Sequence, residues 1–327
     1  MFMRPFAASD PAASAVKEFA ADVEYYLTLC PRQLPSRYFY DALGSALFDA
    51  ICRLPWYQVT RAESGLLRTH GRDILRHVAP LSSIVELGPG NGSKLATLLE
   101  SDTTRSRRLR LHLIDVSSAA LETSSQTLSV LHNVDIVTHQ ATYETGLADL
   151  AGAPASRDRM LALFLGSNIG NFDRPGAAEF LLNIRRALAV EDGLLLGADL
   201  VKPERELLAA YDDPLGVTAA FNRNLLVRIN HELGGAFDID AFAHRAVWNA
   251  AESRVEMHLV SLRRQAVRVE GAGLAFTMEE GETIWTESSY KYYPAGITAV
   301  LEGAGFRAVE QWIDRADGFA LTLARAV

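Results

Sequence analysis

The chain has 327 residues, of which 49% are hydrophobic and 22% charged. This composition is close to that of average globular proteins, so it excludes a disordered, collagen-like or coiled-coil chain. At about 100 to 200 residues per domain, the length predicts two domains or one domain with a large insertion. The 40 acidic against 32 basic residues give a net charge of -8. Because an acidic surface repels phosphate backbones, we expect no nucleic-acid partner.

Three features bear on where the protein works. Its two cysteines, Cys30 and Cys52, are too few for a disulfide framework and lack the C-x-x-C spacing of zinc or redox sites. Residues 1–6 are followed by Ala, Ser, Asp and Pro rather than by the apolar core of a secretory signal. No apolar run approaches the roughly 18 residues that a membrane helix needs. The sequence therefore predicts a cytoplasmic protein without a membrane partner.

Short apolar runs alternate with helical stretches from about Ser64 to Asp199, a rhythm typical of βαβ units. Between the runs, Phe180, Ile184 and Leu188 fall on one face of a predicted helix. Five runs are short enough for strands and bounded by turn residues: 83–87, 109–116, 134–138, 160–165 and 193–198. We therefore expect at least five parallel strands connected by helices.

The pattern changes after Leu200. Residues 204–211 and 217–233 read as helices, and 254–262 alternate apolar with polar side chains, which indicates a half-exposed antiparallel strand. Two further strands, 306–313 and 319–324, are expected to complete the first sheet. The predicted fold is therefore an open α/β sheet, formed by residues 61–199 and 293–327, with a second domain made of residues 1–60 and 200–292.

A glycine-rich turn follows the first clear strand, in the sequence VELGPGNGSK from Val85 to Lys94. Its G-x-G-x-G spacing lets backbone approach a ligand closely. Ser93 stands where a dinucleotide fingerprint would have Gly or Ala, and no P-loop can be written through Gly88 and Lys94. Asp115 ends the next strand, where a carboxylate can accept both hydroxyls of a ribose. This pairing favours a nucleoside ligand over the alternative of a tight turn without one. An acidic residue before G-x-G-x-G resembles motif I of class I S-adenosylmethionine-dependent methyltransferases.

Four further segments are similar to one family. They are YFYDALGSALFD (38–49) with LPWYQVTRAE (54–63), FLGSNIGN (164–171), GADLVK (197–202) with AYDDPLGVTAAFNRN (210–224), and TESSYKY (286–292). These segments resemble the L-histidine Nα-methyltransferases of ergothioneine biosynthesis, and the likeness runs from about Tyr25 to Ala326. It implies a class I, Rossmann-like methyltransferase sheet with an inserted α+β substrate-binding lobe.

The resemblance also implies a reaction. S-adenosylmethionine would donate three methyl groups in succession to the α-amino group of histidine, giving trimethylhistidine, or hercynine. Such a displacement requires a deprotonated amine held about 3 to 3.5 Å from the methyl carbon, which is mainly a positioning task. We expect no metal, because the eight histidines are scattered without ligand spacing.

The residues of the substrate site follow from the same resemblance. Asn171, Tyr211 and Tyr57 match the contacts to the amino-acid head group. An amide can orient the amine without favouring the ammonium form, as a carboxylate would. Tyrosine faces also suit a cationic product. For each tyrosine taken alone, the simpler interpretation is that it packs within the lobe. The surrounding motif favours a substrate contact instead.

Glu287 and Ser289 match the pair that holds the substrate side chain, and Met257 matches an apolar position beside it. A carboxylate can accept the imidazole N–H while a hydroxyl donates to the ring's lone pair. Because indole offers only an N–H, this pair favours histidine over tryptophan.

The cofactor residues implied by the resemblance are Tyr40, Gly88, Gly90, Lys94 and Asp115. We expect Lys94 to meet the cofactor carboxylate and Tyr40 to lie over the cofactor. At the adenine the family usually has Asp followed by Phe, whereas this chain has Thr142 and Tyr143. A neutral hydroxyl brings no charge to the adenine amine, so this departure predicts weaker cofactor binding.

Several alternatives remain open from the sequence. The substrate can be another aromatic, tryptophan-like amino acid or derivative. The sheet alone also permits a nicotinamide-dependent oxidoreductase, against which Ser93 argues, and a non-catalytic cofactor-binding relative would keep nearly all these residues. Because the antiparallel lobe shows no long exposed apolar stripe, we expect a monomer.

Overall fold

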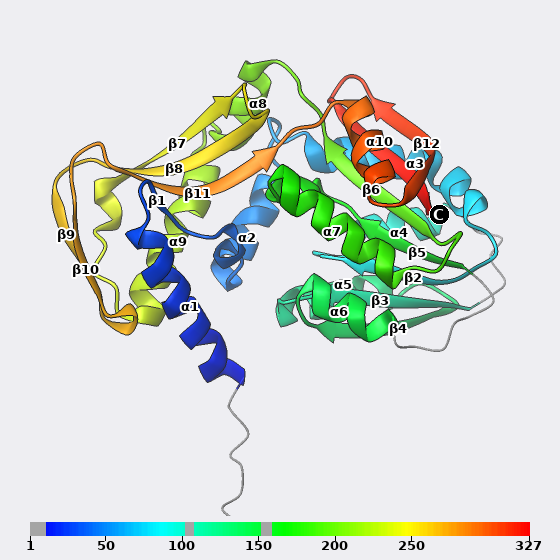
Figure 1. Cartoon of the computed structure of the whole chain (residues 1–327), viewed down its shortest axis with the longest axis horizontal. Coiled ribbons are helices and arrows are strands. Elements are labelled where there is room, and N and C mark those ends of the chain that lie inside the picture. The colour runs from blue at the N-terminus through cyan, green and yellow to red at the C-terminus, as the bar shows by residue number, and fades with distance from the viewer. Residues whose placement is uncertain (1–10, 102–107, 152–158) are drawn as a thin grey trace, which may run out of the picture. The chain divides into compact units, whose positions relative to one another are not determined.

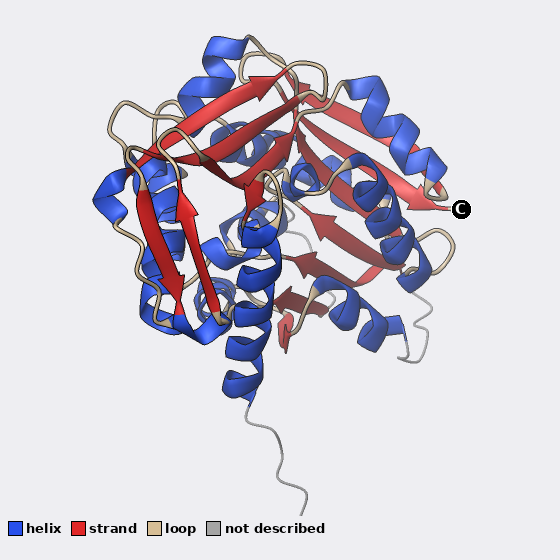
Figure 2. Cartoon of the chain, turned by 60° about the vertical axis from the view of Figure 1, so that its left-hand side comes forward, coloured by secondary structure: helices blue, strands red, loops and turns tan. Residues whose placement is uncertain are grey.

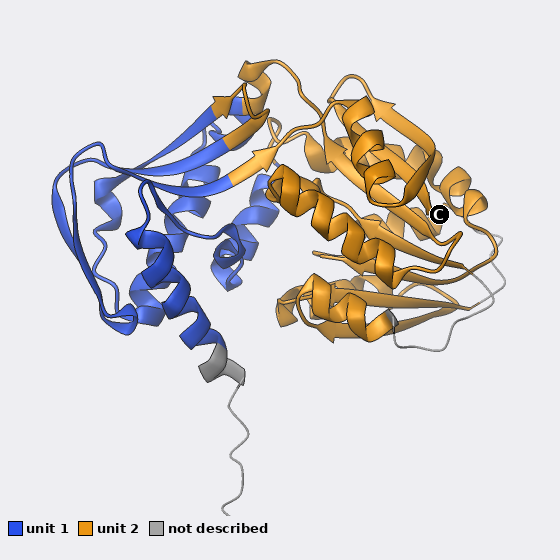
Figure 3. Ribbon diagram, in the orientation of Figure 1, with its two compact units in different colours: residues 1–53, 208–247, 256–287 blue, residues 54–207, 248–255, 288–327 orange. Residues whose placement is uncertain are grey.

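The computed structural model describes residues 11–101, 108–151 and 159–327. Residues 1–6, from which the lack of a secretory signal was predicted, lie outside these ranges. The chain forms two compact units, one of residues 1–53, 208–247 and 256–287, the other of residues 54–207, 248–255 and 288–327 (Figure 3). The functions given above to residues 61–199 with 293–327 and to residues 1–60 with 200–292 stay predictions.

A seven-stranded sheet organises the second unit, in the order β12-β13-β6-β5-β2-β3-β4 (Figure 1). Five strands are parallel: β2 (Leu81–Leu87), β3 (Leu109–Asp115), β4 (Val134–Gln140), β5 (Arg159–Phe164) and β6 (Gly193–Asp199). The last two, β12 (Phe306–Asp314) and β13 (Phe319–Ala326), pair antiparallel and join the sheet at β6. The predicted α/β class, the five parallel strands and the completion of the sheet by the C-terminal strands are confirmed.

Helices cover both faces of this sheet (Figure 2). One layer contains α3 (Val59–His77), α4 (Ser93–Glu100) and α5 (Ser118–Leu128), and the other α6 (Tyr143–Ala151), α7 (Arg174–Ala187) and α10 (Pro294–Gly303). The central strands are apolar on both faces because both are buried, and residues 193–199 of β6 are all buried. The carboxyl ends of β2, β3, β5 and β6 lie along one edge, which is where such sheets bind ligands.

The first unit combines helices with smaller sheets. Its helices are α1 (Pro11–Thr28), α2 (Ala42–Ile51) and α9 (Val217–Leu233), with 3-10 turns at Ser36–Phe39, Ile239–Ala241 and Glu270–Ala272. Helix α8 (Glu204–Tyr211) begins in the second unit and ends in this one. A four-stranded sheet has the order β1 (Arg32–Gln33), β11 (Thr283–Tyr290), β8 (Arg254–Ser261), β7 (Phe242–Asn249), and β9 (Gln265–Val269) pairs with β10 (Leu274–Met278). Residues 248–249, 254–255 and 288–290 of these strands belong to the second unit. The predicted helices at 204–211 and 217–233 are confirmed.

Burial alternates along β8, where Val255, Met257 and Leu259 are buried and their neighbours are partly exposed. The period-two pattern of residues 254–262 therefore identified this strand correctly. Among the described residues, no helix is long and apolar enough to cross a membrane.

Candidate active site

The loop between β2 and α4 is shaped by three glycines. Gly88, Gly90 and Gly92 have φ values of 73°, 56° and 76°, a region that side chains rarely adopt. A Cβ on Gly88 would lie 2.6 Å from the Tyr143 hydroxyl, and one on Gly92 would lie 3.0 Å from the backbone of Ser124. The loop ends at the N-terminus of α4, where the helix dipole favours an anionic group. The Gly92 N–H there donates to the Pro89 carbonyl at 2.9 Å, and the Ser93 N–H donates to Asn91 Oδ1 at 3.1 Å. This backbone can therefore cradle a ligand carboxylate.

A buried carboxylate that the sequence analysis missed lies behind this loop. Glu63, on α3, is 0% exposed, and its Oε2 pairs with Lys94 Nζ at 2.6 Å. Both of its oxygens accept from the N–H of Gly166 at 2.9 Å, and a Cβ on Gly197 would lie 2.0 Å from its Oε1. Lys94, predicted to meet the cofactor carboxylate, is thus already paired with a fixed negative charge. Only the position of Glu63 at the end of the segment 54–63 hinted at this role.

Glu86 is the acidic residue that precedes the glycine motif. It lies near the end of β2 and is 1% exposed. Burial raises its pKa to about 8, an effect that Lys94 reduces and Glu63 reinforces. Its Oε2 has no hydrogen-bond partner among the described residues. A buried polar atom without a partner is unusual in a folded protein. Its place under the glycine loop fits a site that a polar ligand completes.

The predicted nucleoside residues follow β3 and β4. Asp115 ends β3, where its Oδ1 accepts from the Ser117 N–H at 2.8 Å. Burial raises the pKa of Asp115, although this backbone bond acts in the opposite direction. The exposed Thr142 precedes α6 and accepts from the Thr145 N–H at 3.4 Å. The Tyr143 ring packs 5.7 Å from Phe180, and burial raises the pKa of its hydroxyl, which lies against Gly88.

The predicted amine contact, Asn171, lies on the loop after β5. There Gly166 and Ser167 have φ values of 78° and 59°, and a 3-10 turn spans Asn168–Asn171. Asn171 is exposed at the end of this turn. A Cβ on the preceding Gly170 would lie 2.7 Å from the Tyr290 carbonyl oxygen. The Asn171 loop therefore packs directly on the end of β11.

The end of β11 carries Ser289, a predicted contact to the substrate side chain. Ser289 is buried, and its Oγ accepts from Lys291 Nζ at 3.0 Å. Strand alternation places Glu287, which is partly exposed, on the same face of β11 as Ser289. Tyr57, before α3, is also buried, and its N–H donates to the Leu54 carbonyl at 3.2 Å. In the second unit, Asn171 and Ser289 thus lie on two segments that pack against each other.

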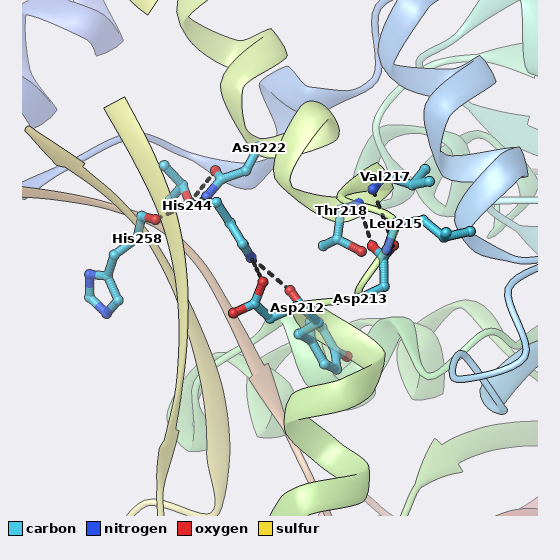
Figure 4. A network of polar contacts seen from close by, with 10 residues as sticks. Asp212, Asp213, Leu215, Val217, Thr218, Asn222, His244 and His258 are labelled. Carbon is cyan, nitrogen blue, oxygen red and sulfur yellow. Dashed lines mark hydrogen bonds and ion pairs between the residues drawn. The ribbon is translucent and has the colours of Figure 1, made fainter. Parts of the chain in front are cut away.

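In the first unit, Asn222 and His244 belong to a polar network (Figure 4), which reaches the carbonyl of Tyr211. His244 Nε2 donates to the Tyr211 carbonyl at 2.7 Å, and Asn222 Nδ2 lies 2.9 Å from His244 Nδ1. Asn222 Oδ1 accepts from the Thr286 hydroxyl at 2.7 Å, so its NH2 group must be the donor to His244. His244 is therefore neutral with its proton on Nε2, in agreement with a pKa lowered by burial.

The turn after Tyr211 is fixed by Asp213. Its carboxylate accepts from the N–H groups of Leu215, Val217 and Thr218 at 3.0, 3.2 and 2.7 Å (Figure 4). Burial acts to raise the pKa of Asp213, but these bonds dominate and lower it. They satisfy N–H groups at the start of α9, which would otherwise lack partners.

Two other predicted residues of this unit lie in its core and at its surface. Met257 is buried, and its carbonyl accepts from the Thr286 hydroxyl at 3.0 Å. The Tyr40 ring is 36% exposed and packs edge-on against Phe48 and Phe221, with centroids 5.6 and 5.9 Å away. Across the described ranges, no group of three or more His, Cys, Asp or Glu side chains is placed to hold a metal ion.

Comparison with known proteins adds independent information. The model of the family described as "Histidine-specific methyltransferase, SAM-dependent" matches residues 19–326. The chain is 40% identical to the histidine N-alpha-methyltransferase of Mycolicibacterium smegmatis, covering 98% of this chain and 97% of the relative. It is also 40% identical to the enzyme of the same name from Mycobacterium tuberculosis, covering 93% of each. A 4-dimethylallyltryptophan N-methyltransferase of Penicillium roqueforti is 27% identical, covering 88% of this chain and 87% of that protein. The chain therefore belongs to the histidine-specific, S-adenosylmethionine-dependent methyltransferase family.

Proposed function

We propose that the chain methylates the α-amino group of L-histidine, in three successive transfers that give hercynine. The observation that carries this proposal is 40% identity, over nearly the whole chain, to two histidine N-alpha-methyltransferases. The packing of the Asn171 loop on the end of β11, through Gly170 and Tyr290, supports it. Predicted contacts to the amine and to the side chain of one amino acid are thereby held together.

The second unit supplies the features that fit the methyl donor. The glycine loop, with its positive φ values and the unpartnered Glu86 oxygen beneath it, suits a polar ligand that approaches the backbone. Gly88, Gly90, Lys94 and Asp115 would hold S-adenosylmethionine, together with Tyr40, Thr142 and Tyr143. When bound, this cofactor supplies an electrophilic methyl group. Because Glu63 already balances Lys94, the dipole at the N-terminus of α4 would provide part of the attraction for the cofactor carboxylate.

The chain's own residues then orient the amino acid. Asn171 would accept a hydrogen bond from the substrate amine. The amine would stay neutral, with its lone pair available for the methyl group. Tyr57 and Tyr211 would contact the head group, and their ring faces stabilise a cationic product by about 0.5 to 2 kcal/mol. Glu287 would accept the imidazole N–H, Ser289 would donate to the ring's other nitrogen, and Met257 would fill the apolar side.

Incubation of the purified protein with S-adenosylmethionine and L-histidine tests this function. Mass spectrometry is expected to show products with one, two and three added methyl groups, and no increase in mass would contradict the proposal. A panel that includes L-tryptophan separates histidine from the substrate class named for the Penicillium roqueforti relative. The cytoplasmic location, the monomeric state and the lack of a metal requirement stay predictions, and retention of activity in a strong chelator tests the last.

Paired variants test the assignment of residues. Glu287→Ala is expected to weaken histidine binding by roughly tenfold or more while leaving the affinity for S-adenosylhomocysteine unchanged, because it removes a charge-assisted hydrogen bond to the ring. Asp115→Ala is expected to have the opposite pattern, because it removes the contact to the ribose. Isothermal titration calorimetry with each ligand measures both effects. Equal losses of both affinities in either variant would refute the division of roles.

A further inference from the structure

Lys291 has no role in the function proposed above, yet its surroundings are unusual. It directly follows β11, and its side chain is 0% exposed. Burying an ammonium group is costly unless the charge is paired and its N–H groups find acceptors. A lysine in such a position therefore needs a structural or functional reason.

The acceptors around the ammonium group include a carboxylate and a hydroxyl. Lys291 Nζ pairs with Asp199 Oδ2 at 2.9 Å and donates to Ser289 Oγ at 3.0 Å. Asp199 is itself buried, 2% exposed, and its Oδ1 pairs with Lys202 Nζ at 2.7 Å. The Asp199 N–H donates to Ser167 Oγ at 2.9 Å, which ties this cluster to the Asn171 loop. Lys291 is thus held between a fixed carboxylate and the hydroxyl of Ser289.

The contact with Lys291 determines the direction of the Ser289 hydroxyl. An ammonium group has three donors and no acceptor, so Ser289 Oγ must accept in this bond. The hydroxyl hydrogen cannot point at Lys291 and must be directed to an acceptor elsewhere. A serine without such a neighbour can rotate and either donate or accept.

We propose that Lys291 is a positioning residue that makes Ser289 a hydrogen-bond donor, so that the site selects a ring with an unprotonated nitrogen. The inference rests on the proposed function, in which Ser289 meets the imidazole of histidine. A neutral imidazole has a lone pair to receive this hydrogen. A ring with N–H or C–H at the same place would oppose a donor and lose the bond, so selectivity for histidine depends on Lys291 as well as on Ser289.

Calorimetric titration of L-histidine into the protein saturated with S-adenosylhomocysteine tests the proposal. Lys291→Met keeps the length of the side chain and removes its donors. It is expected to raise the histidine Kd by about tenfold, as for the loss of one hydrogen bond. Ser289→Ala is expected to raise it similarly. If Lys291 acts through Ser289, the double variant will bind histidine no worse than Ser289→Ala alone, whereas additive losses would overturn the proposal.

Lys202→Met is the matched control. Lys202 pairs with the same carboxylate, Asp199, and also donates to the Asp317 carbonyl at 2.5 Å. This variant removes an ion pair of Asp199 while sparing the contact to Ser289. Because Lys291 still pairs with Asp199 in this variant, the histidine Kd is expected to stay within about twofold of that of the unaltered protein. An equal loss in Lys202→Met and Lys291→Met would show that disruption around Asp199 is the cause, and would overturn the proposal.

Two further measurements distinguish a loss of binding from a loss of folding. The melting temperature and the Kd of S-adenosylhomocysteine report whether each variant is folded. Should Lys291→Met not fold, Lys291→Gln replaces it, because a neutral amide both donates and accepts and leaves the hydroxyl without a fixed direction. A histidine Kd unchanged in Lys291→Gln would then overturn the inference. If the unaltered protein does not bind histidine at all, the proposed function fails.

Discussion

The carboxyl group of Glu86 illustrates how a single buried residue ties the stability of the protein to pH. Burial raises its pKa from the usual 4.5 to about 8. Between these values the folded state keeps a proton on Glu86 that the unfolded state has released. Stability is therefore expected to fall as pH rises from about 4.5 to 8, and this contribution levels off above that.

Glu86→Gln removes this dependence, because an amide resembles a protonated carboxyl group and cannot ionise. The variant is expected to be more stable than the unaltered protein at pH 8, by about 4 to 5 kcal/mol, and to show little difference at pH 5. Thermal unfolding from pH 5 to 9 measures the change. Glu100→Gln, at an exposed position of α4, serves as the control. A difference in melting temperature that is the same at pH 5 and pH 8 would contradict the prediction.

Thr142 allows a second test at the scale of one residue. It is exposed and its hydroxyl accepts from the Thr145 N–H at the start of α6, a role that aspartate fills equally well. Thr142→Asp restores the acid usual in the family. It is expected to tighten S-adenosylhomocysteine binding by about three- to tenfold, because a charged acceptor strengthens the bond from the adenine amine. Calorimetry measures this affinity, and Thr142→Asn is the uncharged control. If Thr142→Asn gains as much affinity as Thr142→Asp, the charge is not responsible.

Sequence patterns pointed to some candidate residues of the site and missed others for a physical reason. Asp115 and Asn171 follow the carboxyl ends of predicted strands, so topology alone places them at one edge of the sheet. Glu63 and Lys291 act through partners far away in the chain, Lys94 and Asp199, and no spacing rule connects such pairs. Their importance depends on burial and distance, which only a folded structure supplies.

Among the elements, the 3-10 turn of Asn168–Asn171 packs closely on the backbone of another element, β11, near the candidate site. A methyl group on Gly170 would lie 2.7 Å from the backbone oxygen of Tyr290. Gly170→Ala is therefore expected to displace the turn from β11, lowering stability by about 1 to 3 kcal/mol and weakening histidine binding. Chemical denaturation and calorimetry measure the two effects.

Gly303, the last residue of α10, provides the matched control for Gly170. A Cβ there meets nothing within 4 Å, and the residue is exposed. Gly303→Ala is expected to change stability by no more than about 1 kcal/mol, in the stabilising direction, and to leave histidine binding as it is. Equal losses in the two variants would mean that the contact between Gly170 and Tyr290 is unimportant.

Regular elements were predictable where one periodicity dominates. The bounds of α8 and α9 match the predicted ranges, because apolar residues recur there at helical spacing between clear turn residues. Strand β4 extends to Gln140, beyond the predicted end at residue 138, because backbone pairing with β3 continues through polar residues. The two-residue strand β1 was not predicted, since its pairing with Ile284 and Trp285 leaves no periodic signal.

For the molecule as a whole, composition and pattern established the α/β class and an interrupted sheet, while boundaries between compact units depend on long-range contacts. The net charge of -8 and the lack of a long exposed apolar stripe lead us to expect a monomer. Light scattering after size-exclusion chromatography should therefore give a mass near 35.8 kDa. A mass near twice this value, stable on dilution, would refute the expectation.

The chain leaves the large sheet and returns beside its point of departure. Leu200 and Tyr292 form a parallel backbone bridge, and the Val201 N–H donates to the Tyr292 carbonyl at 2.9 Å. None of the strands of the seven-stranded sheet lies between these two residues. Because the two ends of the inserted segment lie side by side, the segment can be exchanged without changing the path of the chain through the sheet. For protein engineering, this junction is a splice point: residues 201–291 contain no strand of the large sheet, and an exchange must also include residues 1–53, because they belong to the same compact unit.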